Sequence, residues 1–245
     1  ETDGYTVRLR RDGKEQAIKA RFVVGADGTT LVVRKSMFPA LTVTSYMAYR
    51  ECYRGTLNLD RDYYHVFSSC QLTPLYCGVH YKGDTFLLEG GGRGKDQANE
   101  MREWTKEILA KDYGFALEDK PLWNDGCIEP VMYSGLFSGS FPPAKGNALL
   151  VGNAGGLNVP LTGEGIGTAI ESGLMAASSI VQANERGEKA EVFYLEKVAG
   201  LISKLRGFFP SVGKVRDQLD GDAETLLKAV TEFWRGNIAF SKSLF

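Results

Sequence analysis

The clearest hydrophobic pattern in the chain is an apolar run that meets a cluster of glycines and is followed by a helical period. Ala148–Val151 is apolar without alternation, which is typical of a strand buried on both faces, and Gly152–Gly156 predicts a turn. Apolar residues then recur at i, i+3, i+4 and i+7, which predicts a helix with one apolar face that lies against a sheet. That face comprises Ile166, Ala169, Ile170, Gly173, Leu174, Ala177, Ile180 and Val181. We expect Thr162 to be the N-cap of this helix and Gly187 to end it.

A second apolar run lies far upstream and has a similar form. Phe22–Val24 is again continuous, and it ends in a glycine turn that contains an acid, Gly25-Ala26-Asp27-Gly28. Both runs therefore predict strands that are covered on both faces. The glycine turn that opens the downstream helix would direct unpaired backbone N–H groups toward an anionic or electron-rich ligand.

Between these two runs the pattern changes to short strands and one helix. Runs rich in Tyr, Val, Phe and Cys alternate with turns, which predicts an antiparallel sheet, and a helical period follows them. The predicted strands are Ser45–Tyr53, Tyr63–Phe67, Leu75–Tyr81 and Thr85–Glu89, and the predicted helix is Asp96–Lys111.

Both ends of the chain carry further elements. Tyr5–Leu9 alternates and returns through Asp12-Gly13 to Ala17–Ala20, which predicts a hairpin. Near the other end, Glu188–Leu205 and Asp222–Trp234 predict two helices separated by the segment 207–213, which contains Gly207, Pro210 and Gly213. The last helix has an apolar stripe of Leu226, Leu227, Val230, Phe233 and Trp234.

These elements predict an α/β protein with an α+β insert. Residues 1–36 and 147–187 would form an incomplete, discontinuous doubly wound layer that binds a nucleotide. Residues 37–146 would form an antiparallel-sheet substrate domain, and residues 188–245 a C-terminal helical region.

Composition excludes several classes of function. The chain has 245 residues, 43% of them apolar, and a net charge of −1, which suits a globular protein that does not bind nucleic acid. His65 and His80 are its only histidines and its four cysteines have no Cys-x-x-Cys spacing, so no metal site is expected. Free thiols are expected, with a Cys52–Cys70 disulfide as the alternative. No apolar run approaches the length of a membrane-spanning helix, so we expect a cytoplasmic protein, with Leu201–Val215 as an alternative lipid-surface segment.

The two glycine turns, in this order, resemble the two downstream flavin motifs of the glutathione-reductase-type FAD oxidoreductases, in particular the geranylgeranyl reductase and aromatic hydroxylase branches. Geranylgeranyl reductases also have a motif of Tyr-x-Trp-x-Phe-Pro, seven or eight residues, and Gly-x-Gly. Here Tyr76, the spacing and the glycines Gly90–Gly92 match it, whereas Gly78, His80 and Tyr81 replace Trp, Phe and Pro.

The resemblance implies roles for particular residues. Asp27 and Gly28 would contact the nucleotide chain of the flavin, and Gly152 and Asn153 the ribityl region, with Asn153 where the family has Asp. Pro160 would rigidify the approach to the ring, while N–H groups around Gly163, Gly165 and Ile166 would face the isoalloxazine and stabilise its reduced form. No catalytic residue is identified; Tyr76 and His80 are candidates that face the substrate, with packing as the alternative role.

The resemblance also predicts a function and a cofactor. It implies an FAD-dependent oxidoreductase that reduces carbon–carbon double bonds of an apolar, isoprenoid or lipid substrate, with NAD(P)H or another reductant as electron donor. The alternatives are an FAD-dependent monooxygenase or halogenase and a non-catalytic ligand-binding remnant. Because no Gly-x-Gly-x-x-Gly turn precedes a helix here, we expect a fragment whose partner is the missing N-terminal dinucleotide-binding half. The isolated chain would then be inactive and would retain little FAD.

Overall fold

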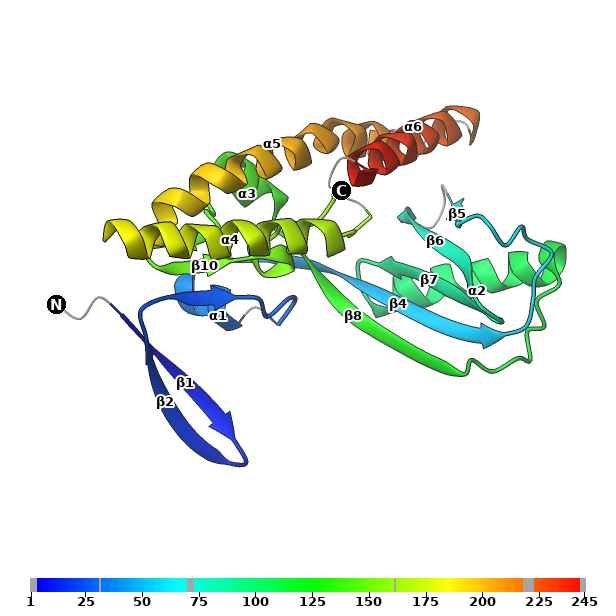
Figure 1. Ribbon diagram of the computed structural model, residues 1–245. Coiled ribbons are helices and arrows are strands. Elements are labelled where there is room, and N and C mark those ends of the chain that lie inside the picture. The colour runs from blue at the N-terminus through cyan, green and yellow to red at the C-terminus, as the bar shows by residue number, and fades with distance from the viewer. Residues whose placement is uncertain (1–3, 31, 70–72, 161, 218–222, 243–245) are drawn as a thin grey trace. The chain divides into compact units, whose positions relative to one another are not determined.

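The computed structural model describes residues 4–30, 32–69, 73–160, 162–217 and 223–242 (Figure 1). Contacts within the chain divide it into two compact units. The first unit comprises Glu1–Val43, Met132–Phe209 and Asn237–Phe245, and the second comprises Thr44–Val131 and Pro210–Gly236. The mixed α/β class and the antiparallel sheets predicted from the sequence are confirmed.

Two small sheets belong to the first unit. The predicted hairpin forms from β1 (Tyr5–Arg11) and β2 (Lys14–Ala20), and a second sheet has the order β3-β10-β9, with β3 (Val23–Gly25), β9 (Ala144–Lys145) and β10 (Ala148–Leu150). β10 runs parallel to β3 and antiparallel to β9. The Tyr5 hydroxyl joins the hairpin to the β9–β10 turn, because it donates to the Lys145 carbonyl at 3.0 Å and accepts from the Asn147 N–H at 3.0 Å.

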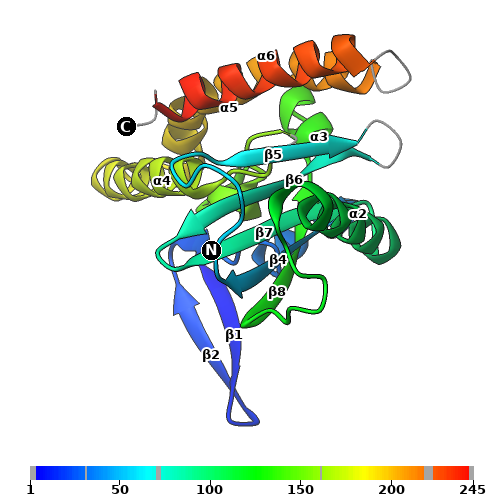
Figure 2. The same ribbon diagram turned by 90° about the vertical axis from the view of Figure 1, so that its right-hand side faces the viewer.

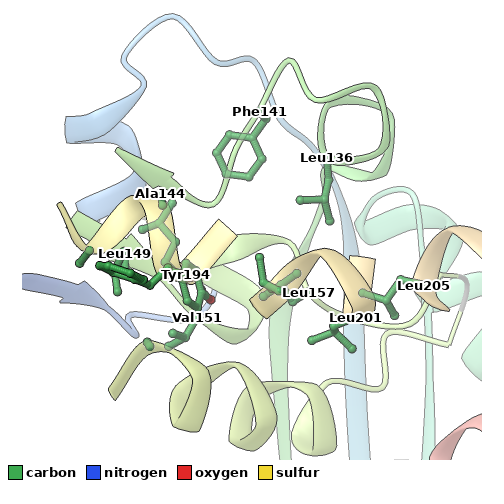
Figure 3. Close-up of a cluster of buried hydrophobic side chains, with 14 of the residues drawn as sticks. Leu136, Phe141, Ala144, Leu149, Val151, Leu157, Tyr194, Leu201 and Leu205 are labelled. Carbon is green, nitrogen blue, oxygen red and sulfur yellow. The ribbon is translucent and has the colours of Figure 1, made fainter. Parts of the chain in front are cut away.

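Helices of the first unit cover β10, whose three residues are all buried, but Val24 of β3 is 42% exposed, so the prediction that this strand is covered on both faces is wrong. These helices are α1 (Val32–Met37), α3 (Tyr133–Ser138), the short 3₁₀ helix η1 (Gly152–Gly155), α4 (Ile166–Arg186) and the first part of α5 (Ala190–Asp217). Figure 3 shows Ala144, Leu149 and Tyr194 at one end of the resulting core and Leu157, Leu201 and Leu205 at the other. The Tyr194 hydroxyl donates to the Leu150 carbonyl at 2.7 Å, so this buried phenol has a hydrogen-bond partner on the sheet.

The prediction for the apolar face of α4 is wrong. The buried face of α4 consists of small and hydroxyl-bearing residues, Gly167, Thr168, Ser172, Ala176, Ser179 and Ala183. Large apolar side chains are exposed instead, with Ile166 76% and Leu174 69% exposed, and Ile170 and Val181 also exposed. The small residues allow close approach, since the Ser172 hydroxyl reaches the Gly152 N–H at 3.0 Å and the Thr168 hydroxyl bonds the Leu157 carbonyl. We refer to Ile166, Ile170, Leu174 and Val181 as the α4 stripe.

The sequence predicts the C-terminal end of α4 correctly and its N-cap wrongly. Gly187 does end the helix, in the left-handed conformation with φ 68°, and its N–H bonds the Ala183 carbonyl. Thr162 is not the N-cap; Gly165 holds that position, and the Thr162 hydroxyl instead accepts from the Glu164 N–H at 3.2 Å. The reason is that the Glu164 carboxylate takes the exposed N–H groups of the first turn.

The second unit is a five-stranded antiparallel sheet with one long helix against it (Figure 2). The strand order is β5-β6-β7-β4-β8, with β4 (Thr44–Arg54), β5 (His65–Ser69), β6 (Thr73–Lys82), β7 (Thr85–Gly92) and β8 (Trp123–Val131). The helix is α2 (Lys95–Tyr113), which packs Met101 and Leu109 onto Val79 and Leu88. β8 is an element that the sequence patterns did not predict.

A buried ion cluster lies between this sheet and α2. Glu51 on β4 is 6% exposed; its carboxylate accepts from the Tyr53 hydroxyl at 2.7 Å and pairs with Lys106 of α2 at 2.9 Å. Arg102 lies 3.7 Å from the other carboxylate oxygen. Burial, together with the bond to Glu51, raises the pKa of the Tyr53 phenol, so this hydroxyl stays a donor.

The predicted break in the C-terminal helices is wrong. α5 continues through Pro210 to Asp217, and α6 (Ala223–Lys242) follows it. Glycine and proline lower helix propensity, but propensity is a weak constraint where a helix is packed, and Leu201 and Leu205 are buried just before the predicted break. On α6 Phe233 is buried, whereas the side chains of Leu226 and Leu227 lie outside the described part of the structure. The same holds for the side chains of Phe209 and residues 211–215 of the predicted lipid-surface segment.

The thiols of Cys52, Cys77 and Cys127 are free, so the alternative disulfide at Cys52 does not form, and Cys70 lies outside the described residues. Within the described ranges no three His, Cys, Asp or Glu side chains gather as metal ligands. None of the described helices combines the length and apolar character that crossing a membrane requires.

Candidate functional site

The two glycine turns come together in the first unit. β3 and β10 are parallel neighbours whose last pair is Gly25 with Leu150, and the Val151 N–H bonds the Gly25 carbonyl at 3.0 Å. Asp27 and Asn153 therefore follow the carboxyl ends of adjacent parallel strands. That edge of a parallel sheet is where open α/β folds bind their ligands.

Arg34 on α1 connects the two turns, and sequence reasoning missed it. Its side chain is 1% exposed, and Nη1 donates to the Ala154 carbonyl at 3.1 Å and to the Asn153 carbonyl at 3.4 Å. Burial lowers the pKa of Arg34 to about 10, and the negative charge of Asp27 opposes that shift. The only sequence signal for this contact is that Asp27 precedes a short helix that carries Arg34. Such a spacing does not distinguish a buried arginine from one on the surface.

Asp27 has a structural role that the sequence did not predict. One carboxylate oxygen accepts from the Val33 N–H at 3.1 Å and thereby caps the start of α1, while its own carbonyl accepts from the Thr30 N–H at 3.2 Å. The other carboxylate oxygen is buried and has no hydrogen-bond partner, and the same holds for Nη2 of Arg34. Buried polar atoms without partners are rare in proteins, so this pair indicates a place for a polar ligand or water.

Glycine geometry shapes the second turn. Gly152 has φ 54°, and a Cβ there would lie 2.9 Å from Cβ of Ala169, so a side chain would be strained and would push α4 away. A Cβ on Gly165 would lie 2.7 Å from Oδ1 of Asn153, which places that amide against the start of α4. The structure thus brings Gly152, Asn153 and Gly165 together, as the sequence predicts.

The start of α4 differs from the predicted anion site, because its N–H groups already have acceptors. The Glu164 carboxylate accepts from the N–H groups of Ile166 at 3.1 Å and Gly167 at 3.3 Å. The Gly163 N–H bonds the Val159 carbonyl at 3.0 Å. A carboxylate at this position satisfies both the unpaired donors and the helix dipole, so a ligand that reaches these N–H groups must first displace Glu164.

Two further predicted residues of this unit, Pro160 and Gly28, lie in different segments, Pro160 between η1 and α4 and Gly28 in the turn after β3. Pro160 is buried, and Gly28 has φ 57° with open space around the position of a Cβ. Asn158, which the sequence patterns did not suggest, is 2% exposed, and its Oδ1 has no hydrogen-bond partner. It is a third buried polar atom, after those of Asp27 and Arg34, that is open to a ligand.

The two catalytic candidates lie in the second unit, on β6. His80 is half-buried, with Nδ1 3.7 Å from the Glu89 carboxylate. Tyr76 is part of the strand, but its side chain lies outside the described residues. Tyr64, which stacks on His80, lies in the predicted strand Tyr63–Phe67, but sequence reasoning missed it as a site residue because it belongs to no motif.

Sequence comparison finds relatives at low identity. No family model matches the chain. Protein CbrA of Escherichia coli O9:H4 is 26% identical over 207 residues, which cover 84% of this chain and 54% of that protein. Protein CbrA of Shigella dysenteriae is 27% identical, with 84% of this chain and 55% of that protein covered. The chain thus spans about half the length of these relatives.

Solved structures share the fold. A geranylgeranyl bacteriochlorophyll reductase-like protein of Thermoplasma acidophilum matches with a TM-score of 0.64 and 19% identity, covering 100% of this chain and 68% of that chain. The flavin-dependent halogenase CmlS matches with a TM-score of 0.65 and 16% identity over 96% of this chain and 42% of that one. PqsL of Pseudomonas aeruginosa, a probable FAD-dependent monooxygenase, matches with a TM-score of 0.60 and 17% identity, covering 91% of this chain and 62% of that chain. The fold is therefore that of FAD-dependent oxidoreductases, monooxygenases and halogenases.

The residues at the β3–β10 edge fit the nucleotide part of such a cofactor. Three buried polar groups lack one partner each, on Asp27, Arg34 and Asn158. The positive φ angles of Gly28 and Gly163, with open space around each, would let a ligand approach the backbone closely.

Proposed function

We propose that the chain is part of an FAD-dependent oxidoreductase that acts on an apolar substrate, with reduction of isoprenoid carbon–carbon double bonds as its reaction. The observation that carries the proposal is the convergence of Asp27 and Asn153 at the carboxyl edge of two parallel strands, bridged by Arg34. The fold shared with flavoproteins supports it. The cytoplasmic location and the substrate class stay predictions.

Each residue of the edge has a role in this proposal. Asp27 and Gly28 would bind the nucleotide chain, with the orphaned oxygen of Asp27 as acceptor and Nη2 of Arg34 as donor. Gly152 and Asn153 would hold the ribityl chain, and Gly163, Gly165 and Ile166 the ring edge, behind Pro160. FAD would supply the electron transfer, with NAD(P)H or another reductant as donor.

Two alternatives have observations in their favour. Gly78 and His80 replace the aromatic residues of the geranylgeranyl reductase motif, which favours a monooxygenase or halogenase with a more polar substrate site. Glu164 already satisfies the start of α4, and Asn153 can offer only a neutral amide oxygen, which favours a ligand-binding remnant that has lost its cofactor. A neutral hydrogen bond contributes about 0.5–1.5 kcal/mol against about 1.5–3 for one to a charged group.

We also propose that the α4 stripe is covered by the N-terminal dinucleotide-binding half of the same protein. Four large apolar side chains in one row are more than isolated exposed residues, and the row begins at Ile166, the first residue of α4, next to the candidate site. β3 is an edge strand that pairs in parallel with β10, and its Val24 is 42% exposed, whereas strands of parallel pairs are ordinarily covered on both faces. The matched regions fill only 54% and 68% of the lengths of a curated relative and a solved structure, so both have further chain that could provide such a cover.

Substituting Gly165 by valine tests the flavin proposal. In a polypeptide that joins this chain to the preceding half, FAD is expected to bind stoichiometrically. Gly165→Val is expected to weaken it at least tenfold, because the new side chain occupies the place of Asn153 and approaches Asn158. Titration followed by flavin fluorescence measures the affinity.

Gly173→Ala is the matched control, since a Cβ there meets no heavy atom within 4 Å and the position is in the same helix. Its affinity for FAD should equal that of the unsubstituted protein. A joined polypeptide that is folded by circular dichroism but stays colourless with FAD would overturn the flavin assignment in favour of the remnant.

Substituting Leu174 by glutamate tests the cover over the α4 stripe. The change is expected to leave the isolated chain folded, because Leu174 is exposed there, but to prevent co-purification with the separately expressed N-terminal half. Val192→Glu adds the same charge at an exposed apolar position of α5, outside the α4 stripe, and should leave co-purification unchanged. Equal recovery with both variants would exclude the stripe as the contact.

A further inference from the structure

The sheet of the second unit has one face covered by α2 and one face that α2 does not cover. Tyr49, Cys77 and Leu88 belong to the buried cluster that includes the α2 residues Met101 and Leu109. Side chains alternate along a strand, so Arg50, Gly78, His80 and Glu89 point to the opposite face. We call it the open face.

Tyr64 crosses the open face through a gap that a glycine provides. Gly78 of β6 is paired with Glu89 of β7, and the Tyr64 hydroxyl donates to Oε1 of Glu89 at 2.9 Å. A Cβ on Gly78 would lie 1.9 Å from the Tyr64 hydroxyl oxygen, so any other residue would displace the phenol. The departure of Gly78 from the Trp of the geranylgeranyl reductase motif therefore has a physical result, namely a phenol bonded to a carboxylate.

Aromatic rings form a wall beside this carboxylate. The rings of Tyr64 and His80 are stacked, with centroids 5.3 Å apart and an interplanar angle of 25°, and Trp234 of α6 lies 6.2 Å from Tyr64. The tyrosine is 41% exposed, so a molecule can reach its ring. The stacked rings of Tyr64 and His80 together with the carboxylate present an aromatic surface with a hydrogen-bond acceptor beside it.

Glu89 retains capacity for a ligand. The residue opposite it on β4 is Arg50, but Nε and Nη2 of that guanidinium donate to Asp125, at 3.0 and 2.6 Å. His80 lies too far for a direct hydrogen bond, at 3.7 Å, and its Nδ1 is buried without a partner. The second carboxylate oxygen of Glu89 accepts no hydrogen bond from the described residues.

We propose that the open face binds a flat ring that carries a hydrogen-bond donor, a phenolic hydroxyl or an amine, with the ring against Tyr64 and His80 and the donor on Glu89. This substrate class differs from the isoprenoid of the proposed function and agrees with the monooxygenase alternative, and it rests on the flavoenzyme assignment only where the bound molecule is called a substrate. A purely hydrocarbon isoprenoid chain would desolvate the second carboxylate oxygen of Glu89 without offering it a donor, which disfavours such a chain at this site.

The test uses the 245-residue chain without FAD, so that its outcome is independent of flavin binding. Binding of 4-ethylphenol, 4-ethylanisole and phenethylamine is followed by NMR shifts of the probe and of the His80 ring. We expect 4-ethylphenol or phenethylamine to bind at least about tenfold more tightly than 4-ethylanisole, which has the ring but no donor. The stronger of the two shows whether the donor is neutral or cationic.

Variants locate the site. Glu89→Gln is expected to remove the preference over 4-ethylanisole, and Gly78→Ala to weaken all three probes by displacing Tyr64. Glu118→Gln, at an exposed position of the same unit, and Gly94→Ala, where a Cβ meets nothing within 4 Å, are the matched controls. Equal affinity for the three probes, or an unchanged preference in Glu89→Gln, would overturn the proposal, whereas absence of FAD binding in the joined polypeptide would not affect it.

Discussion

Replacing Arg34 with methionine is expected to lower the free energy of unfolding of the first unit by about 3–5 kcal/mol. The guanidinium bonds the carbonyls of Asn153 and Ala154 and lies in the field of Asp27. Methionine fills a similar volume but donates no hydrogen bond. The substitution therefore leaves the Asp27 charge without its buried counter-charge and two carbonyls without their donor, while the apolar packing is largely kept.

Hydrogen exchange measures this loss where it occurs. Amides of β3 and β10 should lose protection by more than about a hundredfold in Arg34→Met, because these strands carry the two turns that Arg34 bridges. Lys35→Met is the control, since Lys35 is the next residue of α1 and is exposed. If the amides of β3 and β10 are equally protected from exchange in both variants, the contacts of Arg34 contribute nothing to stability, and its role in the site must be abandoned.

Local patterns predict most of the elements because hydrophobic periodicity and turn residues act at short range. The hairpin around Asp12-Gly13, the continuous strands at Val23 and Ala148, and α2 all follow from such patterns. β8 does not, because Trp123–Val131 contains Asp, Gly and Pro, and it is recruited by pairing with β4. Tertiary pairing can outweigh poor strand propensity in this way.

Periodicity also identifies an apolar face without saying what covers it. On α4 the small side chains, such as Ser172 and Ala176, lie inward because the sheet and η1 are close, and the α4 stripe remains outside. Hydrophobic periodicity favours leucine over serine on a buried face. Where a helix packs closely, however, only small side chains fit, and hydrogen bonds such as that from the Gly152 N–H to the Ser172 hydroxyl satisfy their polar groups.

The candidate site could be predicted only where glycine and acid mark the turns. Asp27, Gly152 and Asn153 are identified by such a motif, and the parallel pairing of β3 with β10 brings them to one edge. Arg34 and Tyr64 carry no local signal, because their partners are 119 and 25 residues away. Contacts at such separations depend on the completed fold, so they require the structure.

Replacing Glu51 with glutamine is the corresponding prediction for the second unit, with an expected loss of about 3–5 kcal/mol in the free energy of unfolding. The carboxylate is buried, pairs with Lys106 at 2.9 Å and accepts from the Tyr53 hydroxyl at 2.7 Å. Glutamine keeps the shape but removes the charge, so an ammonium group that is only 15% exposed loses its counter-charge. Glu103 also lies near Lys106, but its side chain is 57% exposed. Glu103→Gln should therefore lower the free energy of unfolding by less than about 1 kcal/mol.

The three tryptophans of the chain make this prediction easy to measure, because Trp104, Trp123 and Trp234 all belong to the second unit. Tryptophan fluorescence can therefore follow unfolding by urea. The midpoint of the transition should shift to a lower urea concentration in Glu51→Gln and stay nearly unchanged in Glu103→Gln. The double variant Glu51→Leu, Lys106→Met removes both charges at once, and we expect it to recover most of the loss, since a buried pair is costly mainly when one partner is left alone. If the double variant is as unstable as Glu51→Gln, the cluster contributes through the Tyr53 hydrogen bond and not through its charges.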